Sequence, residues 1–332
     1  MGDKIGITGG AGFIGAYLVK KFVSMGFHVV AIDNFMRGTP ERLKDIAGQF
    51  EMKKVDITDL SQLISATEGC KAIFHLAAIN GTENFYKIPD KILEVGVKGM
   101  FNVMDACLKN GIKELVIASS AEAYQDPESV PTNESVILKV PDPSNPRYSY
   151  GASKLISEVI AFNYYRDHFT KLQIFRPHNI YGPDMGTKHV IPQFILRLLE
   201  LLENNPGKDS VLDFEIQGDG LETRAFCYID DLVDALITMY EKGGHREIYH
   251  LGNPEEVNIL GVVDALFEPL EQEYKIIAKP LTAGSVKRRC PDISKISRLG
   301  YSPSVMLKEG VRKTYDWYRE FYNTNKSQNT LI

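Results

Sequence analysis

The chain has 332 residues, of which 44% are hydrophobic and 24% are charged. This balance is typical of a globular protein with one large domain, or one domain with an appended lobe, and it excludes general disorder and fibrous repeats. The net charge of −5 provides no basic field for nucleic-acid phosphates, so we expect no nucleic-acid partner.

The four cysteines are far apart in the sequence, and no pair has the Cys-x-x-Cys spacing of a metal site. We therefore expect no disulfide framework, no bound metal and a reduced, cytoplasmic location. The most apolar long stretch, residues 190–202, is interrupted by polar and charged side chains, so we expect no membrane span. A strand follows the first four residues directly, so we also expect no signal peptide.

Short apolar runs alternate with amphipathic stretches through the first half of the chain. The runs predict strands at residues 5–7, 29–32, 50–55, 72–76 and 115–119. The amphipathic stretches predict helices at residues 16–25, 91–110 and 153–169. Apolar strands that alternate with helices are typical of a parallel sheet covered on both faces, so we predict a doubly wound, Rossmann-type α/β fold.

The second half is more mixed. We predict helices at residues 190–204 and 230–242, and strands at 212–217 and 248–252. We expect the Rossmann domain to comprise residues 1–180 plus about 212–252. Residues from about 181 to 211, with 253–332, should form a smaller mixed α/β lobe that binds the substrate.

A glycine-rich turn follows the first strand, with Gly9, Gly12 and Gly15 before and inside the next helix. Glycines at this spacing let the backbone approach a pyrophosphate, which the helix N-terminus attracts. Strand 2 ends at Asp33, whose carboxylate can accept hydrogen bonds from the adenosine ribose. A carboxylate would repel a 2′-phosphate, so the pattern favours NAD over NADP, although Arg37 is close by. Asp56 is compatible with either an adenine contact or a turn cap.

Tyr150 and Lys154 are four residues apart, so they share one face of the predicted helix. A lysine close to a tyrosine hydroxyl favours the phenolate and should lower the tyrosine pKa. Such a tyrosine can take a proton from a sugar hydroxyl while a hydride passes to nicotinamide. Ser120 follows strand 5 at the carboxyl edge of the sheet, where its hydroxyl can share that proton.

Taken in order, these motifs resemble those of the extended short-chain dehydrogenase/reductase superfamily, in its nucleotide-sugar epimerase/dehydratase branch. The resemblance extends over nearly the whole chain, through the segments 75–78, 176–183, 224–231 and 289–295. It implies an NAD-dependent enzyme that acts on a nucleotide-diphosphate sugar, and a homodimer formed through the helices at 91–110 and 153–169. His75 fits a buried histidine at a strand end better than a catalytic one.

The resemblance also implies residue roles. The expected catalytic residues are Ser120, Glu122, Tyr150 and Lys154. The expected substrate contacts are Asn179, Val190, Arg224, Arg289 and Asp292, with Asn179 and Arg224 at the diphosphate. Lys287 and Arg288 are equally charged neighbours of Arg289. The expected cofactor contacts are Gly9, Gly12, Phe13, Ile14, Gly15, Asp33, Asn34, Asp56, Ile57, Leu76, Ala77, Ala78, Ser119, Tyr150, Lys154 and His178.

Two positions depart from the branch pattern. Many members have an asparagine where Gly96 stands, and a glycine where Gln125 stands. A relay through that asparagine would be missing, and Gln125 would reshape the sugar end of the pocket.

The reaction that follows oxidation at C4 of the sugar depends on the residues after Ser120. Glu122 occupies the position at which 4,6-dehydratases and uronate decarboxylases carry their glutamate, whereas 4-epimerases more often have a small or hydroxyl residue there. Ala121 cannot supply the acid that some dehydratases place beside this glutamate. We therefore favour 4,6-dehydratase chemistry, with a 4-epimerase close behind and a uronate decarboxylase third. A non-catalytic NAD-binding protein is a remote alternative, since such proteins typically lose the Tyr or the Lys.

Overall fold

The computed structural model describes residues 2–205, 207, 211–280 and 287–327. The chain divides into two compact units. Unit 1 consists of Met1–Pro177, Leu232–Leu251 and Asp292–Ser302, and unit 2 of His178–Asp231, Gly252–Pro291 and Pro303–Ile332. Within the described ranges, no helix is both long and apolar enough to cross a membrane.

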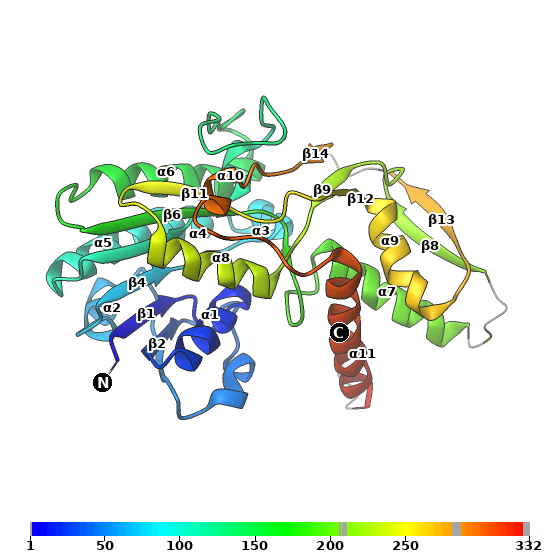
Figure 1. The fold of residues 1–332 in the computed structure, drawn as a ribbon, viewed down its shortest axis with the longest axis horizontal. Helices are drawn as coiled ribbons and strands as arrows, with labels where there is room; N and C mark the ends of the chain where they lie inside the picture. The colour runs from blue at the N-terminus through cyan, green and yellow to red at the C-terminus, as the bar shows by residue number, and fades with distance from the viewer. Residues whose placement is uncertain (1, 206, 208–210, 281–286, 328–332) are drawn as a thin grey trace. The chain divides into compact units, whose positions relative to one another are not determined.

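Unit 1 is built on a seven-stranded sheet with the strand order β11-β6-β5-β4-β1-β2-β3 (Figure 1). All neighbouring strands are parallel. The strand order reverses between β1 and β4, which is where doubly wound folds bind their ligands. The predicted Rossmann-type fold is confirmed. Its strands are β1 (Lys4–Thr8), β2 (His28–Asp33), β3 (Glu51–Lys54), β4 (Ala72–His75), β5 (Glu114–Ala118), β6 (Lys171–Pro177) and β11 (Glu247–Leu251).

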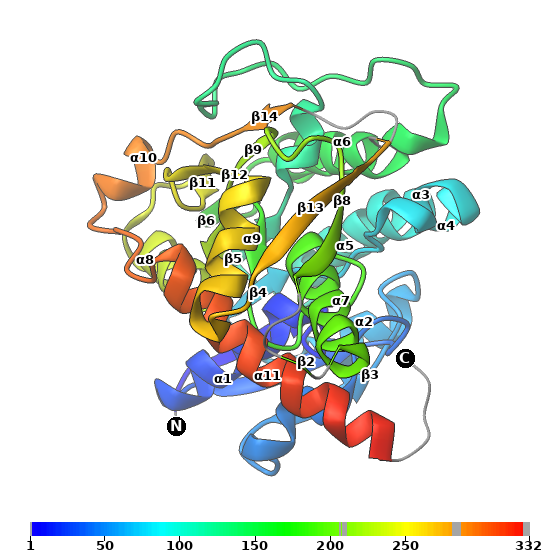
Figure 2. The ribbon, with the colours of Figure 1, turned by 90° about the vertical axis from the view of Figure 1, so that its right-hand side faces the viewer.

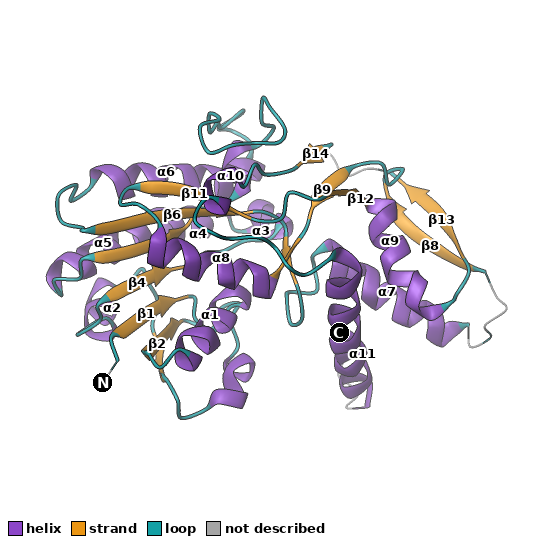
Figure 3. Ribbon diagram, viewed as in Figure 1, coloured by secondary structure: helices purple, strands orange, loops and turns teal. Residues whose placement is uncertain are grey.

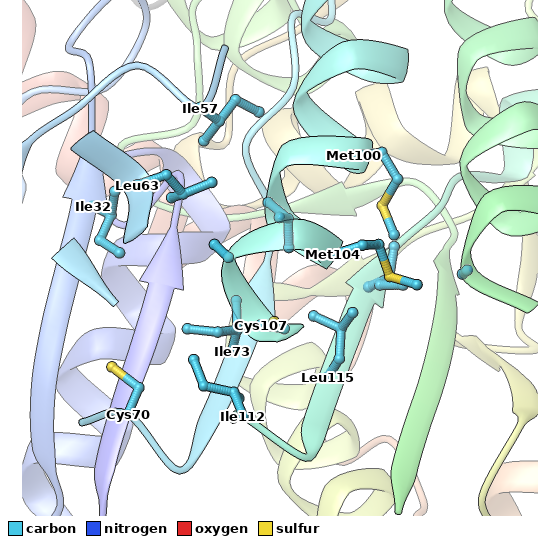
Figure 4. Packing of buried hydrophobic residues seen from close by; sticks show 14 of the residues in the cluster. Ile32, Ile57, Leu63, Cys70, Ile73, Met100, Met104, Cys107, Ile112 and Leu115 are labelled. Carbon is cyan, nitrogen blue, oxygen red and sulfur yellow. The ribbon is translucent and has the colours of Figure 1, made fainter. Parts of the chain in front are cut away.

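Helices cover both faces of this sheet (Figure 3). The helices of unit 1 are α1 (Phe13–Ser24), α2 (Leu60–Ala66), α3 (Thr82–Lys87), α4 (Pro89–Leu93), α5 (Gly99–Lys109), α6 (Ser149–Asn163), α8 (Ile229–Lys242, which begins in unit 2) and α10 (Ser294–Ser297). On one face, apolar side chains of α2, α5 and α6 pack against those of the strands, and Cys70 and Cys107 lie in this core (Figure 4). On the other face, Phe22 of α1 and Tyr240 of α8 pack edge-on against Phe74.

The helix predicted at 91–110 is interrupted. A π-helical turn, Glu94–Lys98, joins α4 to α5. Within it, a Cβ at Gly96 would lie 2.7 Å from the Cβ of Ser153 on α6. An asparagine at position 96 therefore has no room here, which accounts for the first departure from the branch pattern.

In its described residues, unit 2 holds three small sheets and three α-helices of its own. β7 (Ile180–Tyr181) pairs with β10 (Cys227–Tyr228), β9 (Thr223–Ala225) lies between β12 (Glu256–Asn258) and β14 (Arg288–Arg289), and β8 (Leu212–Gln217) pairs with β13 (Tyr274–Lys279). The helix α11 (Leu307–Ser327) packs against α7 (Val190–Asn204) and α9 (Ile259–Phe267) (Figure 2).

The division between the units differs from the expected one. The expectation placed residues 212–231 with the Rossmann domain, whereas the structure places them in unit 2, because the partner of β8 is β13 and not a strand of the large sheet. Residues 292–302 in turn belong to unit 1, where Lys295 of α10 contacts Glu247 and the Ile248 carbonyl of β11.

Candidate functional site

The glycine-rich turn between β1 and α1 forms a tight cradle. Gly9 has a positive φ of 71°, and its carbonyl oxygen accepts the Gly12 N–H at 3.0 Å. A Cβ at Gly15 would lie 2.0 Å from the Gly9 oxygen, so only glycine fits there. A Cβ at Gly9 would lie 2.8 Å from the Ala77 N, so the predicted contacts Leu76, Ala77 and Ala78 follow β4 right beside the turn. α1 begins without a side-chain cap, and its N-terminus suits a pyrophosphate.

Asp33 is buried at the end of β2 and is attached to the same turn. Its carboxylate accepts the Ala11 N–H at 3.0 Å and the Phe35 N–H at 2.8 Å. A carboxylate fixed in this place suits ribose hydroxyls. The cradle and Asp33 together fit a dinucleotide with an unphosphorylated ribose.

In the structure, Asp56 forms a turn cap, which is one of the two roles that the sequence allowed. Burial raises its pKa, but hydrogen bonds from Thr58 and Asn34 outweigh this and hold the pKa below its ordinary value. The Asn34 amide donates to Asp56 at 3.0 Å, which ties the ends of β2 and β3 together. Ile57, the next residue, is buried in the core.

The predicted Ser120, Tyr150 and Lys154 come together at the carboxyl end of β5. The Ser120 hydroxyl hydrogen-bonds Tyr150, and the Lys154 Nζ lies 5.8 Å from the centre of the Tyr150 ring. Lys154 donates to the Ala118 carbonyl at 2.7 Å. Burial lowers the pKa of Lys154 to about 8, although the nearby Glu158 opposes this effect.

The expectation of a lowered Tyr150 pKa is wrong in this structure. Burial raises the pKa of Tyr150 to about 12, and the Glu122 charge adds to that increase. The Ser120 hydrogen bond and the charge of Arg37 act in the opposite direction but are outweighed. The lysine–tyrosine spacing alone gave no signal of this degree of burial.

Glu122 lies two residues after Ser120, whose hydroxyl accepts the Glu122 N–H at 3.1 Å. Its carboxylate lies 3.4 Å from the Arg147 guanidinium, and both side chains keep about a fifth of their surface exposed, 22% and 17%. Arg147 in turn lies over the ring of Phe85, which stacks on Tyr150. Glu122, Arg147, Phe85 and Tyr150 therefore form one cluster. Sequence reasoning missed Arg147, although it lies only three residues before Tyr150.

Gln125, the second departure, ends the short turn that carries Glu122. It adopts a positive φ of 57°, a region that favours glycine. Its side-chain amide donates to the Glu122 carbonyl at 2.7 Å. A Cβ at Gly151 would lie 2.3 Å from that amide nitrogen, so Gln125 packs directly against the start of α6.

His75 is buried at the end of β4, as expected. Burial lowers its pKa to about 3, and its Nδ1 lies 2.8 Å from the Thr8 hydroxyl. A histidine with this pKa is neutral at physiological pH, which suits a structural role. His178 is also buried, and it belongs to unit 2.

The predicted substrate residues of unit 2 include a pair of arginines on adjacent strands. Arg224 on β9 is the register partner of Arg289 on β14. Arg288 instead forms an ion pair with Glu256 at 2.8 Å, which distinguishes it from Arg289. Asn179 donates its amide to the Ala225 carbonyl at 3.0 Å, next to Arg224 in sequence. The Arg224 guanidinium donates to the Thr223 carbonyl at 2.7 Å and to the Lys287 carbonyl at 3.3 Å. Arginines at paired positions of adjacent strands can provide the donors that a phosphate ligand needs.

The other two predicted substrate residues lie elsewhere. Val190 is the first residue of α7 in unit 2. Asp292 belongs to unit 1, where its carboxylate accepts the Ser294 N–H at 2.8 Å before α10. Hydrogen bonds from the Ser294 hydroxyl and from the Ser294 N–H hold the pKa of Asp292 below its ordinary value. In the described part of the chain, no group of three or more His, Cys, Asp or Glu side chains is placed to hold a metal ion.

The model of the NAD dependent epimerase/dehydratase family matches residues 5–252. The chain belongs to this family. It is 33% identical to UDP-glucuronic acid decarboxylase 3 of Arabidopsis thaliana over 315 residues, which cover 93% of this chain and 86% of the relative. Its fold is similar to that of a Thermotoga maritima UDP-glucose 4-epimerase solved with UDP-glucose, with a TM-score of 0.84, 26% identity and coverage of 96% and 99% of the two chains.

A second solved structure, a dTDP-glucose 4,6-dehydratase of Streptomyces venezuelae with NAD bound, has a TM-score of 0.83, 27% identity and coverage of 97% and 98%. This family member is therefore an enzyme that uses NAD. Its relatives are decarboxylases, epimerases and dehydratases, so the family determines the cofactor and the class of enzyme but leaves the specific reaction open.

Proposed function

We propose that the protein oxidises the sugar of a nucleotide-diphosphate sugar at C4 and then acts at C5 of the 4-keto sugar through Glu122. The observation that carries this proposal is the cluster in which Glu122 lies beside Tyr150, the residue that would act at O4. If the residue at position 122 only stabilised the edge of the sheet, a carboxylate next to Tyr150 would not be needed there.

The first step uses Ser120, Tyr150 and Lys154. Tyr150 takes the proton from the sugar O4, and the Ser120 hydroxyl, already bonded to Tyr150, shares it. The Ser120 hydrogen bond and the charge of Arg37 favour the phenolate, against the effect of burial. NAD, when bound, accepts the hydride from C4. We assign its pyrophosphate to the turn at Gly9–Gly15 and its adenosine ribose to Asp33, and we keep Asn34, Asp56, Ile57, Ser119 and His178 as further expected contacts.

The second step uses the acidity that a C4 ketone gives to the proton on C5. The Glu122 carboxylate can remove this proton, and the Arg147 guanidinium lies 3.4 Å from it. In 4,6-dehydratase chemistry, the electron pair then expels the C6 hydroxyl, which leaves as water after taking a proton. Return of the hydride to C6 and of a proton to C5 would complete the 4-keto-6-deoxy sugar and restore NAD. Ala121 cannot donate that proton, so dehydration needs another acid at C6.

A uronate decarboxylase is the second candidate, and Arg147 is the observation that favours it. Its partly exposed guanidinium, next to Glu122, could hold a carboxylate at C6 of the sugar. A 4-keto uronate loses this carboxylate as CO₂, its bonding electrons pass to the C4 oxygen as an enolate, and C5 then takes up a proton. Return of the hydride to C4 would reduce the ketone and restore NAD. This route needs no acid at C6. A 4-epimerase would need no carboxylate at position 122.

In unit 2, we assign Arg224, Arg289 and Asn179 to the substrate diphosphate, with Val190 as a further contact. Asp292 would lie near the nucleoside. The register pairing of Arg224 with Arg289 supports the first assignment.

We also propose a homodimer formed through α5 and α6. These helices expose Phe101, Leu108, Ile156 and Val159, with Val159 52% exposed. Of the other apolar positions in these predicted helices, Ile92 and Ile160 are buried inside unit 1. Light scattering should report a dimer for the wild type and a monomer for Val159→Glu; a monomeric wild type would reject the proposal. We keep the cytoplasm as the expected location, in line with the burial of all four cysteines.

The reaction is tested by incubating the purified protein with UDP-, GDP-, CDP- and dTDP-sugars, including uronates, and by following the products by NMR and mass spectrometry. Loss of water identifies a dehydratase, and loss of carbon dioxide a decarboxylase. A product of unchanged mass with inverted C4 identifies a 4-epimerase and contradicts a step at C5. NAD binding without turnover on any of these sugars would contradict an enzyme of this class.

A further inference from the structure

Glu158 and Arg176 form a buried ion pair inside unit 1. Their side chains are 6% and 3% exposed, and the Arg176 Nη2 and Nε lie 2.6 Å and 2.9 Å from the Glu158 carboxylate oxygens. This arrangement is bidentate. Because both charges have been removed from water, such a pair contributes little net stability compared with apolar residues of the same size.

The same ion pair contacts both ends of a short segment, Ser119 to Tyr124. The Ser119 hydroxyl donates to the Glu158 carboxylate. The Arg176 guanidinium donates to the Tyr124 hydroxyl, which also lies 2.7 Å from the Nε2 of His250. Ser120 and Glu122 lie between these two attachments.

Glu158 is also one helical turn after Lys154 on α6, and its charge favours the protonated lysine. The other groups close to Lys154 bring no negative charge that could replace it. They are the Tyr150 ring, the neutral His75 of β4 and the Ala118 carbonyl of β5.

We propose that Glu158 and Arg176 are positioning residues that fix the two ends of the Ser119–Tyr124 segment and so hold Ser120 and Glu122 next to Tyr150. The positioning itself follows from contacts within unit 1. Only its consequence for the reaction rests on the proposed function.

Hydrogen exchange tests the positioning without any substrate. Glu158→Leu/Arg176→Met replaces the ion pair by apolar side chains and should preserve the fold. Ser119→Ala/Tyr124→Phe keeps the ion pair but removes its bonds to the segment. We expect amide exchange in residues 120–125 to become about tenfold faster in both double variants. The control is Asn102→Leu, which removes the bond of a buried side chain to the Ile57 carbonyl elsewhere in unit 1.

Unchanged exchange in residues 120–125 in the Ser119→Ala/Tyr124→Phe variant would overturn the proposal, even if the other double variant failed to fold. An equal acceleration in Asn102→Leu would also overturn it, because the effect would then reflect the stability of unit 1 as a whole.

The second readout is the pH profile of NAD reduction by a nucleotide sugar. In Glu158→Leu/Arg176→Met, Lys154 lacks its negative neighbour and should lose its proton at a lower pH. The alkaline limb of the pH profile should therefore lie at lower pH than in the wild type. Tyr124→Phe removes one attachment but retains both Glu158 and Ser119, the latter an expected cofactor contact, so its rate should fall by about tenfold or more with no such shift. If the ion pair had only a structural role, neither the alkaline limb of the pH profile nor the rate would change. If no sugar reduces NAD in the wild type, the proposed function fails, while the exchange experiment still decides the positioning.

Discussion

Arg289 faces Arg224 across the parallel strands β14 and β9, whereas its neighbour Arg288 is held by Glu256. The two arginines at positions 288 and 289 are therefore not equivalent, although the sequence gives them the same charge.

This difference predicts that Arg289→Ala weakens binding of a nucleoside diphosphate by about tenfold or more, the worth of one hydrogen bond to a charged group. Arg288→Ala should leave the affinity within a few-fold of the wild type. Isothermal titration with UDP, GDP, CDP and dTDP measures both variants. Equal losses would mean that the register pairing has no role in binding.

Glu122→Gln keeps the size of the side chain but removes the base. We expect C4 oxidation to survive, seen as transient NADH absorbance when the substrate is added, while product formation falls by on the order of 10²-fold. Tyr150→Phe should abolish the NADH signal itself because it blocks the first step. Turnover of Glu122→Gln within a few-fold of the wild type would show that Glu122 only braces the site.

Arg147 separates the two candidate reactions. If it holds a C6 carboxylate, Arg147→Ala should weaken binding of a nucleotide uronate by about tenfold or more and leave the neutral sugar with the same nucleotide nearly unaffected. Competition titrations with UDP-glucuronate and UDP-glucose, and with the corresponding pairs of the other nucleotides, measure this. Equal effects on both members of a pair would remove the support for the decarboxylase.

The glycine cradle makes a prediction for the cofactor. Gly15→Ala places a Cβ against the Gly9 carbonyl, so the turn must open and NAD affinity should fall by about tenfold or more. Gly186→Ala is the matched control, because the nearest atom to its Cβ would be 3.8 Å away. Fluorescence titration with NAD compares them. Wild-type affinity in Gly15→Ala would place the pyrophosphate elsewhere.

His75 predicts a pH dependence of folding. Its pKa is about 3 in the folded protein and about 6.5 when unfolded. Between these values the unfolded chain binds more protons, so stability is complete above pH 6.5 and declines as the pH falls towards 3. In His75→Asn, the stability lost between pH 7 and pH 5 should be smaller by about 2 kcal/mol. Urea unfolding at both pH values measures it, with the exposed His28→Asn as control. If His75→Asn lost as much stability between pH 7 and pH 5 as the wild type, His75 would not be the source of the pH dependence.

Local sequence patterns predicted the bounds of helices and strands in this chain better than they predicted which strands pair. The bounds of α7 and β8 match the predicted ones, because both follow from the periodicity of the segment itself. The pairing of β8 with β13 depends on residues about 60 positions away, and no motif in either strand indicates it. The expectation that residues 212–231 belong to the Rossmann domain failed for that reason.

The candidate site shows the same limit. The motifs located Ser120, Tyr150 and Lys154, because their spacing carries the chemistry. Arg147 and Glu158 were missed, since a single charge in a sequence reads as a surface residue until its buried or clustered partner is known. The spacing of Glu158, four residues after Lys154 on the same helix, was the one local signal that could have found it.

Unit 1 is formed from segments that are far apart in the sequence, and this has a consequence for its synthesis. The first 177 residues supply six strands of the large sheet, but the strand that covers β6 is β11, which follows about 70 residues later. A nascent chain on the ribosome therefore presents β6 as an unpaired edge while all of residues 178–231 are translated. Such an edge is a template for pairing with other chains. Truncation after Pro177 would make this temporary state permanent, so a Rossmann fragment of that length should aggregate.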